Sequence, residues 1–263
     1  MIAIQNHTIA PAPTPRRVLG AYLEETRCEA LRLLRNVGLV IPVLIMPVGL
    51  YALFAFVITG EAMSREPALA VFLFCAFSVM GISMPALFGL STSLAMEREM
   101  GLLRLKRAQP APTGSWLVAK IACGVGFGVI AYLPLLGLAL AAGKLPVPPT
   151  AVLNLSLTLI ACSIPFCAMG LMIGTLAKGS AAAGYANLVY LPGCYLSGMF
   201  FPLPASMHWQ APVWPQFHVT QLAMHAADPT KPHAEPMLVA IAVLIGFTSL
   251  FSLVAIRRLA ARG

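Results

Sequence analysis

Residues 37–59 read VGLVIPVLIMPVGLYALFAFVIT, 23 consecutive residues without a charged side chain. A run of about 18 or more apolar residues is typical of a membrane-spanning helix, because lipid offers the backbone no hydrogen-bond partner and a helix satisfies its own. Further runs of this kind lie at about 68–95, 115–142, 151–176, 181–201 and 237–256. The sequence therefore predicts an all-α integral membrane protein with six transmembrane helices.

The composition agrees with a membrane protein. The 263 residues are 59% hydrophobic and 10% charged, whereas a soluble domain carries about 25% charged residues. A net charge of +8 would also suit nucleic-acid binding, but in a membrane protein an excess of Lys and Arg usually marks cytoplasmic loops that face anionic lipid. We therefore expect contact with a lipid bilayer and no nucleic-acid partner.

The basic residues fall mainly on one side of the six predicted spans. On that side lie 14 of the 17 Lys and Arg residues, and the other side holds Arg65, Lys144 and Lys231. By the positive-inside rule both ends lie in the cytoplasm, which requires an even number of spans. We expect a multi-pass protein of the bacterial cytoplasmic membrane. Its predicted parts are a cytoplasmic tail with an interfacial helix (1–36), the six-span domain (37–256) and a cytoplasmic C-terminal tail (257–263).

Residues 16–36 are too charged to span a membrane, but their apolar positions are periodic. These positions recur at steps of three and four residues or multiples of them: Leu19, Leu23, Ala30, Leu34 and Val37. The five arginines of this segment fall largely elsewhere, which is the pattern of an amphipathic helix lying in the membrane interface. A solvated basic tail is the alternative, and the periodicity favours the interfacial helix.

Several kinds of chemistry are missing from the chain. The nine acidic residues lie in loops or at the ends of the apolar runs, and Lys120 lies near the end of one. Ion-coupled carriers and intramembrane proteases normally need an ionisable group at membrane depth, so these classes are disfavoured. The sequence contains no GxxxxGK[ST] phosphate loop, so it does not predict ATP binding by that route. Any uphill transport would draw its energy from another polypeptide.

The cysteines and histidines do not predict a metal site. The six cysteines form no CxxC pair, and we expect them to be small packing residues. Four histidines lie in the last outer loop: His208, His218, His225 and His233. On a helix, His218 and His225 would lie about 10 Å apart along the axis, too far to bind one zinc ion. We expect neither a metal nor a cofactor in this chain.

Three motifs resemble those of a known family. The first is Glu97-Arg98-Glu99-Met100-Gly101-Leu102-Leu103, followed by Gln109-Pro110 and then Lys120. The second is Leu196-Ser197-Gly198-Met199-Phe200-Phe201-Pro202, and the third is Pro215 with His218. Their order and their predicted sides of the membrane resemble the permeases of type-2 ABC exporters, the ABC-2 permease family. Gln109 stands at a usual Thr position and Ala119 where Gly is common.

The resemblance implies the permease subunit of an ATP-driven exporter, which forms the translocation path and is not itself an enzyme. Two permeases, identical or homologous, would associate, and two soluble ATPase subunits would bind ATP and Mg beneath them. Loop 97–114 would form a coupling helix in a groove of the ATPase, and the interfacial helix would touch the same ATPase. The candidate coupling residues are Glu97, Arg98, Glu99, Gly101, Leu102, Leu103 and Leu105.

Segment 202–236 resembles the re-entrant outer hairpin of that family. Its candidate gate residues, with those of the preceding motif, are Ser197, Gly198, Phe201, Pro202, Pro215 and His218. Ordinary anchoring of aromatic side chains at the interface is an equally open interpretation of this segment.

Two glycine pairs predict close helix packing, at Gly124 and Gly128 and at Gly170 and Gly174. The GxxxG spacing lets two helix backbones approach closely. We expect this packing within one subunit, with a dimer contact as the alternative.

Two other function classes compete with the permease. A non-transport membrane assembly or signalling subunit would keep the six spans but would need no ATPase. A membrane enzyme is disfavoured by the missing intramembrane acids and metal ligands. Co-purification with a soluble ATPase separates the first class from the permease.

Overall fold

The computed structural model describes residues 15–108, 112, 114–201, 203–231 and 234–262. Every regular element within these residues is a helix. In chain order the elements are α1 (Pro15–Arg35), α2 (Val37–Ala52), η1 (Leu53–Ile58), α3 (Gly60–Arg65), α4 (Pro67–Met84), η2 (Pro85–Gly89), α5 (Leu90–Glu99), α6 (Leu102–Ala108), α7 (Ser115–Ala141), α8 (Pro149–Ala161), α9 (Ser163–Leu176), α10 (Ala181–Leu196), η3 (Ala205–Val213), α11 (Pro215–Ala227) and α12 (Met237–Arg262).

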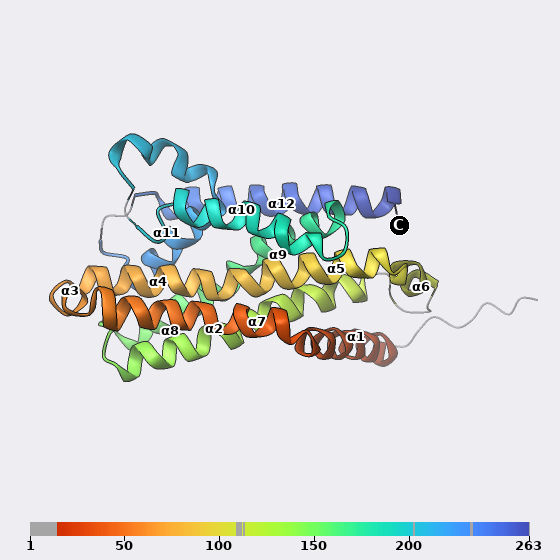
Figure 1. Cartoon of the computed structure of the whole chain (residues 1–263), viewed down its shortest axis with the longest axis horizontal. Helices are drawn as coiled ribbons and strands as arrows, with labels where there is room; N and C mark the ends of the chain where they lie inside the picture. The colour runs from red at the N-terminus through yellow and green to blue at the C-terminus, as the bar shows by residue number, and fades with distance from the viewer. Residues whose placement is uncertain (1–14, 109–111, 113, 202, 232–233, 263) are drawn as a thin grey trace, which may run out of the picture.

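Five helical segments among the described residues are long and apolar enough to cross a membrane. They are Val37–Ile58, Pro67–Glu99, Ser115–Ala141, Pro149–Leu176 and Met237–Ala261. They run along the long axis of the molecule (Figure 1). These segments match the first four predicted runs and the last one, so the chain is an all-helical, multi-pass membrane protein.

The predicted fifth span, residues 181–201, is shorter than expected. Its helix α10 has 16 residues and ends at Leu196, because Gly198 adopts a left-handed conformation with a φ of 72° that turns the chain. At 1.5 Å per residue the helix covers about 24 Å, less than the roughly 30 Å of a hydrocarbon core. Because α10 lies beside the other helices (Figure 1), a sixth span stays a prediction.

The second span forms the centre of the bundle. It runs through α4, η2 and α5, and 89% of its most apolar window is buried inside the chain. Helices α2, α7 and α9 pack along it, and α10 and α11 contact parts of it. The π-helical element η2 begins at Pro85; proline has no N–H to donate, and a π turn is one way to rearrange the helical ladder locally.

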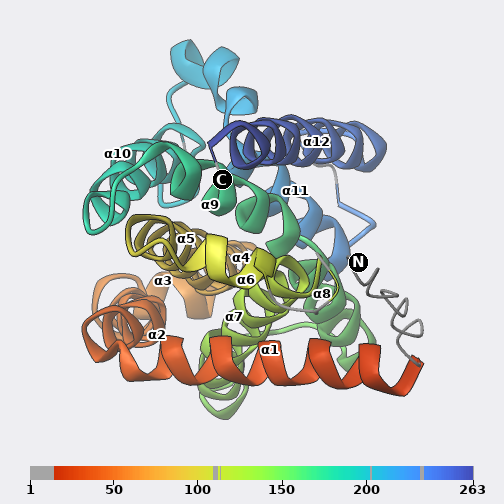
Figure 2. The ribbon, with the colours of Figure 1, turned by 90° about the vertical axis from the view of Figure 1, so that its right-hand side faces the viewer.

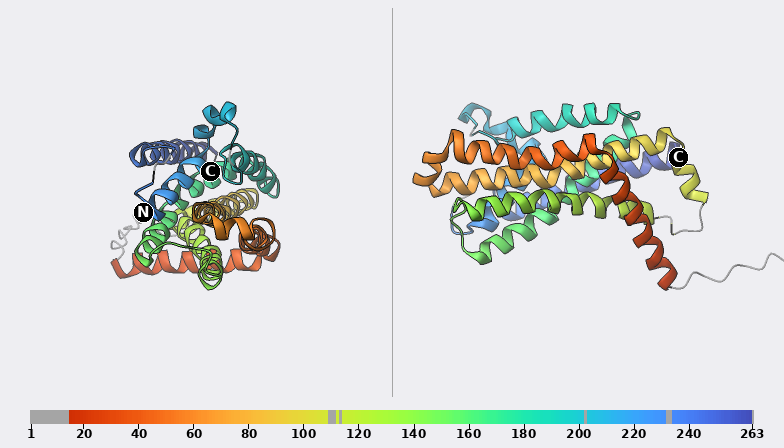
Figure 3. Two further views of the ribbon diagram at one scale, coloured as in Figure 1. Left: turned by 90° about the vertical axis from the view of Figure 1, so that its left-hand side faces the viewer. Right: turned by 60° about the horizontal axis from the view of Figure 1, so that its bottom comes forward.

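Helix α1 runs across one end of the bundle (Figures 2 and 3). It packs on α7 through a face that includes Glu29 and Leu33, both buried. Four of the five predicted apolar positions, Leu19, Leu23, Leu34 and Val37, are exposed on the chain's surface. A helix therefore forms at these residues, with Leu19, Leu23 and Leu34 pointing away from the bundle and Leu33 packed on it. Its place in the membrane interface stays a prediction.

Candidate functional site

The carboxylate of Glu97 is fully buried at the end of α5. Its side chain is 0% exposed, and it lies between three cations from three other helices. Lys120 of α7 lies 3.0 Å away and Lys106 of α6 lies 3.3 Å away, and Arg32 of α1 donates a hydrogen bond to it. Glu97 thus joins the central span to α1, α6 and α7 at one point.

A second buried carboxylate, Glu29 of α1, completes this arrangement. Lys120 lies 2.8 Å from Glu29, Ser93 of α5 donates a 2.6 Å hydrogen bond to it, and Arg32 pairs with it. Lys106 also pairs with Glu25 of α1. We call these residues the charge cluster: Glu25, Glu29, Arg32, Ser93, Glu97, Lys106 and Lys120.

The charge cluster contains three acids and three bases, so its formal charge is zero. Each buried ion loses hydration worth several kcal/mol, which is recovered only when its partners are all in place. Removal of one partner from such a set typically costs about 3–5 kcal/mol. The cluster therefore favours one arrangement of α1, α5, α6 and α7 over looser ones.

The surroundings keep Glu29 ionised. Burial alone would raise the pKa of Glu29, but the charges of Lys120 and Arg32 and the hydrogen bonds from Lys120 and Ser93 lower it from 4.5 to about 2. Desolvation would lower the pKa of Arg32, yet Glu97 and Glu29 raise it. Burial alone would lower the pKa of Lys106, but the carboxylates of Glu25 and Glu97 raise it above its usual value. These three groups therefore carry their charges at neutral pH.

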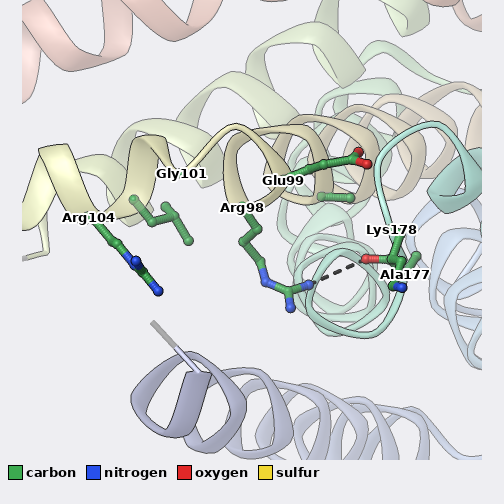
Figure 4. Close-up of a pocket in the computed structure, with 8 residues that line it drawn as sticks. Arg98, Glu99, Gly101, Arg104, Ala177 and Lys178 are labelled. Atoms are coloured by element: carbon green, nitrogen blue, oxygen red, sulfur yellow. Dashed lines mark hydrogen bonds between the residues drawn. The ribbon is translucent and has the colours of Figure 1, made fainter.

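The next residues of the motif hold the end of α9. The guanidinium of Arg98 donates to the carbonyl oxygen of Gly174, at 2.8 Å. It also donates to the carbonyl oxygen of Ala177, at 3.4 Å (Figure 4). Glu99 lies against Gly179 so closely that a Cβ there would come within 1.8 Å of its Oε2 atom. The three consecutive charged residues thus contact different parts of the bundle, which the motif itself did not predict.

Gly101 forms the turn from α5 into α6. Its φ is 70°, a conformation that glycine adopts freely and a residue with a Cβ adopts at a cost of about 1–2 kcal/mol. Of the three leucines predicted as anchors, Leu105 is 62% exposed, Leu102 is half-buried, and Leu103 is 6% exposed within the main core. Leu105 is therefore available to a partner, whereas Leu103 stabilises the chain itself.

A cavity of about 270 Å³ separates α1 from α6 next to the charge cluster. Its walls include Cys28 and Leu105, together with Arg32, Glu97 and Lys106 of the cluster. A group that entered this cavity would contact both helices and would lie beside the buried ions.

The residues predicted at the outer hairpin lie near the opposite end of the bundle. Pro215 is the first residue of α11, a helix that packs against α4, α8 and α12. His218 is buried, with Nδ1 2.6 Å from a Glu235 carboxylate oxygen and Nε2 2.8 Å from the Pro212 carbonyl oxygen. Through these two contacts the ring connects the start of α11 to the segments on either side.

The motif at residues 196–202, before this hairpin, contains both buried and exposed side chains. Ser197 is buried and donates to the carbonyl oxygen of Cys194, whereas Phe201 is exposed and packs against Phe54 of η1 with ring centres 6.1 Å apart. Gly198 makes the turn described above. Pro202, Gln109, Pro110 and His233 lie outside the described residues.

The four predicted packing glycines all lie against the central span. A Cβ at Gly170 would come within 2.7 Å of the Leu87 carbonyl oxygen, and one at Gly174 within 2.9 Å of the Ser91 carbonyl oxygen. Gly128 lies similarly close to Ile82, and Gly124 to Leu90. These close approaches are made within the chain.

Sequence reasoning missed Glu29, Arg32, Ser93 and Lys120 as parts of the site. One signal was present, because Lys120 lies within the third apolar run and a buried lysine needs a carboxylate partner. The residues come from three separate segments, however, and the sequence alone does not pair them. The described residues contain no group of three or more His, Cys, Asp or Glu side chains placed to hold a metal ion.

The long apolar helices, packed around a buried central span and held together at one end by buried charges, define a helical, multi-pass membrane protein. Residues 25–227 match the sequence profile of the ABC-2 type transporter family, so the chain belongs to this family. A Bacillus subtilis (strain 168) protein named "Putative transport permease YvfS" is 27% identical over 237 residues, which cover 87% of this chain and 94% of the relative. Both findings support a role in membrane transport.

Proposed function

We propose that the chain is the permease subunit of an ATP-driven exporter and is coupled to a separate ATPase subunit. The observation that carries this proposal is the connection of α6 to three long helices through Glu97 and the charge cluster. The short helix α6 lies at the end of the molecule beyond α5 (Figure 1), where a soluble partner has access. Family membership and the similarity to YvfS agree with this function.

Coupling would proceed through rigid contacts. The ATPase would bind α6 by the exposed Leu105 and by the neighbouring cavity between α1 and α6. A movement of α6 would then act on the central span through Glu97 and on α9 through Arg98. Nucleotide in the ATPase would shift the population of permeases between inward- and outward-facing states. ATP and Mg would bind to the ATPase, with no cofactor in the permease.

The membrane arrangement follows from the same proposal. The α6 end faces the cytoplasm together with both chain termini, because 14 of the 17 Lys and Arg residues lie on that side. Helix α10 crosses as a short fifth span, and η3 with α11 forms a re-entrant outer hairpin. The exposed leucines of α1 rest in the lipid interface. Two permease copies and two ATPase subunits form the working transporter.

Co-purification tests this function directly. We expect the full-length chain, expressed in its own host and extracted in mild detergent, to retain a soluble ATPase that carries a phosphate loop in a 1:1 ratio. The purified chain alone should hydrolyse no ATP. Robust hydrolysis by the isolated, uncontaminated chain, or a transport-competent permease purified without any ATPase, would contradict the proposal.

A further inference from the structure

A pocket of about 540 Å³ lies between the α5–α6 turn and the loop from α9 to α10 (Figure 4). It is separate from the charge cluster, because its lining includes none of the cluster residues. Small apolar residues and Leu103 form part of its wall. Its charged lining residues are Arg98, Glu99, Arg104 and Lys178.

The pocket has an excess of positive charge that the described chain leaves uncompensated. The carboxylate of Glu99 lies against Gly179, and Arg98 donates to carbonyl oxygens at the end of α9. Within the part of the chain that the structure describes, the exposed side chains of Arg104 and Lys178 form no hydrogen bond or ion pair. Two cations on opposite walls are thus available to an anionic ligand.

The position of the pocket limits the source of that anion. Two candidate spans end beside it, one at Glu99 and one at Leu176. The ends of membrane spans lie where the hydrocarbon core gives way to the headgroup layer, so lipid phosphates surround this level of the protein. The side chain of Leu176 is exposed there, next to the place where an acyl chain would run.

We propose that this pocket binds the phosphate group of an anionic membrane phospholipid. Arginine presents a planar set of donors that matches phosphate oxygens, and lysine adds a compact positive charge. Basic pockets between membrane helices are suited to lipid headgroups of this kind. The inference uses the placement of the spans in a membrane and does not depend on coupling to an ATPase.

Lipid retention by the full-length chain tests the proposal. The chain, purified in neutral detergent, is titrated with phosphatidylglycerol or phosphatidylcholine, and bound lipid is measured by native mass spectrometry. We expect selective retention of phosphatidylglycerol. The double variant Arg104→Ala, Lys178→Ala should weaken that binding by about 30-fold, because each of these cations pairs directly with the phosphate and such a contact is worth a factor of about five.

A matched variant separates the pocket from general surface charge. Arg16→Ala, Arg17→Ala also removes two exposed cations, from α1 outside the pocket, and should weaken binding by about twofold or less. Equal losses in the two double variants, or equal retention of the two lipids, would overturn the proposal. Displacement of phosphatidylglycerol by modest inorganic phosphate would assign the site to a soluble phosphate instead. Loss of a co-purifying ATPase with unchanged lipid binding would assign it to protein contact and overturn the lipid inference.

Discussion

The ammonium group of Lys120 lies between the carboxylates of Glu29 and Glu97, at 2.8 and 3.0 Å, with no exposed surface. Ser93 accepts a further hydrogen bond from it. A buried lysine is favourable in such a place only while both carboxylates are present, and each carboxylate in turn depends on the lysine. The stability of this corner is therefore a property of the set and not of one pair.

Replacement of Lys120 tests this mutual dependence. We expect Lys120→Met, which keeps the side chain's length, to lower the free energy of unfolding by about 3–5 kcal/mol, because two buried carboxylates lose their shared cation. Lys144→Met is the control, since the ammonium group of Lys144 donates to the Gly60 carbonyl oxygen and the Ser64 hydroxyl near the other end, and its loss should cost about 1 kcal/mol. Thermal unfolding in detergent measures both. Equal effects would contradict the role of the cluster.

Acid should weaken the same corner. The pKa of Glu29 in the folded chain, about 2, lies below its ordinary value of 4.5, so ionised Glu29 stabilises the folded state above the ordinary value. This stabilisation is lost as the pH falls from about 4.5 towards 2. We expect the melting temperature of wild type to decline over this window and that of Glu29→Gln to decline less. Parallel curves for the two proteins would show that Glu29 does not contribute.

At the residue scale, the motif predicted that Glu97 matters but not the direction in which it points. The family resemblance implied that Glu97 belongs to the corner that transmits the motion of the ATPase, and the structure buries it among cations of the same chain. Burial depends on α1 folding back across the bundle, and a one-dimensional pattern does not contain that contact. Glu97 is therefore better suited to transmitting motion than to binding the ATPase.

At the element scale, the central span is held by close backbone contacts with α7 and α9. These contacts exist because four glycines present no side chain at the points of approach. The GxxxG spacing predicted the close approach. It did not predict that both glycine pairs would face the same helix, because the spacing carries no information about the neighbouring element.

Two glycine substitutions separate the effect of a close backbone contact on stability from the effect of helix propensity. Gly170→Ala would place a Cβ 2.7 Å from a backbone oxygen of η2, so we expect a loss of about 1–3 kcal/mol in unfolding free energy. Gly137→Ala in α7 meets no atom within 4 Å and should be neutral or stabilising by up to about 1 kcal/mol. Chemical unfolding of both variants measures the difference. Wild-type stability for Gly170→Ala would show that the contact is loose.

The outer elements were harder to predict than the long spans. Length and hydropathy identify five spans directly, because a membrane imposes a minimum helix length. Helix α10 is shorter because a turn at Gly198 ends it, and α11 is placed by packing against α4, α8 and α12. Such packing depends on tertiary contacts, which hydropathy does not report.

At the scale of the whole molecule, the distribution of charge predicts the orientation. In a cysteine-free background, single cysteines at positions 5, 105 and 262 should react with impermeant reagents from the cytoplasmic side. Cysteines at positions 64, 147 and 230 should react from outside, because the few basic residues of that side lie near them. Labelling of intact cells and inverted vesicles measures both sets. External labelling at position 105 would contradict the proposed topology.

The most direct test of coupling uses the turn between α5 and α6. Gly101→Val forces a branched side chain into a conformation with a φ of 70° and so alters the joint between α6 and the central span without shortening any span. The measurement is ATP hydrolysis by the partner and substrate efflux, in vesicles that hold equal amounts of wild type, Gly101→Val and the control Lys144→Met. We predict normal membrane insertion for all three proteins. For Gly101→Val we predict that efflux and coupled hydrolysis fall by about tenfold or more. The reason is that a joint under strain of about 1–2 kcal/mol no longer transmits the movement of α6 to the central span. Wild-type efflux from correctly folded Gly101→Val would contradict coupling through this corner.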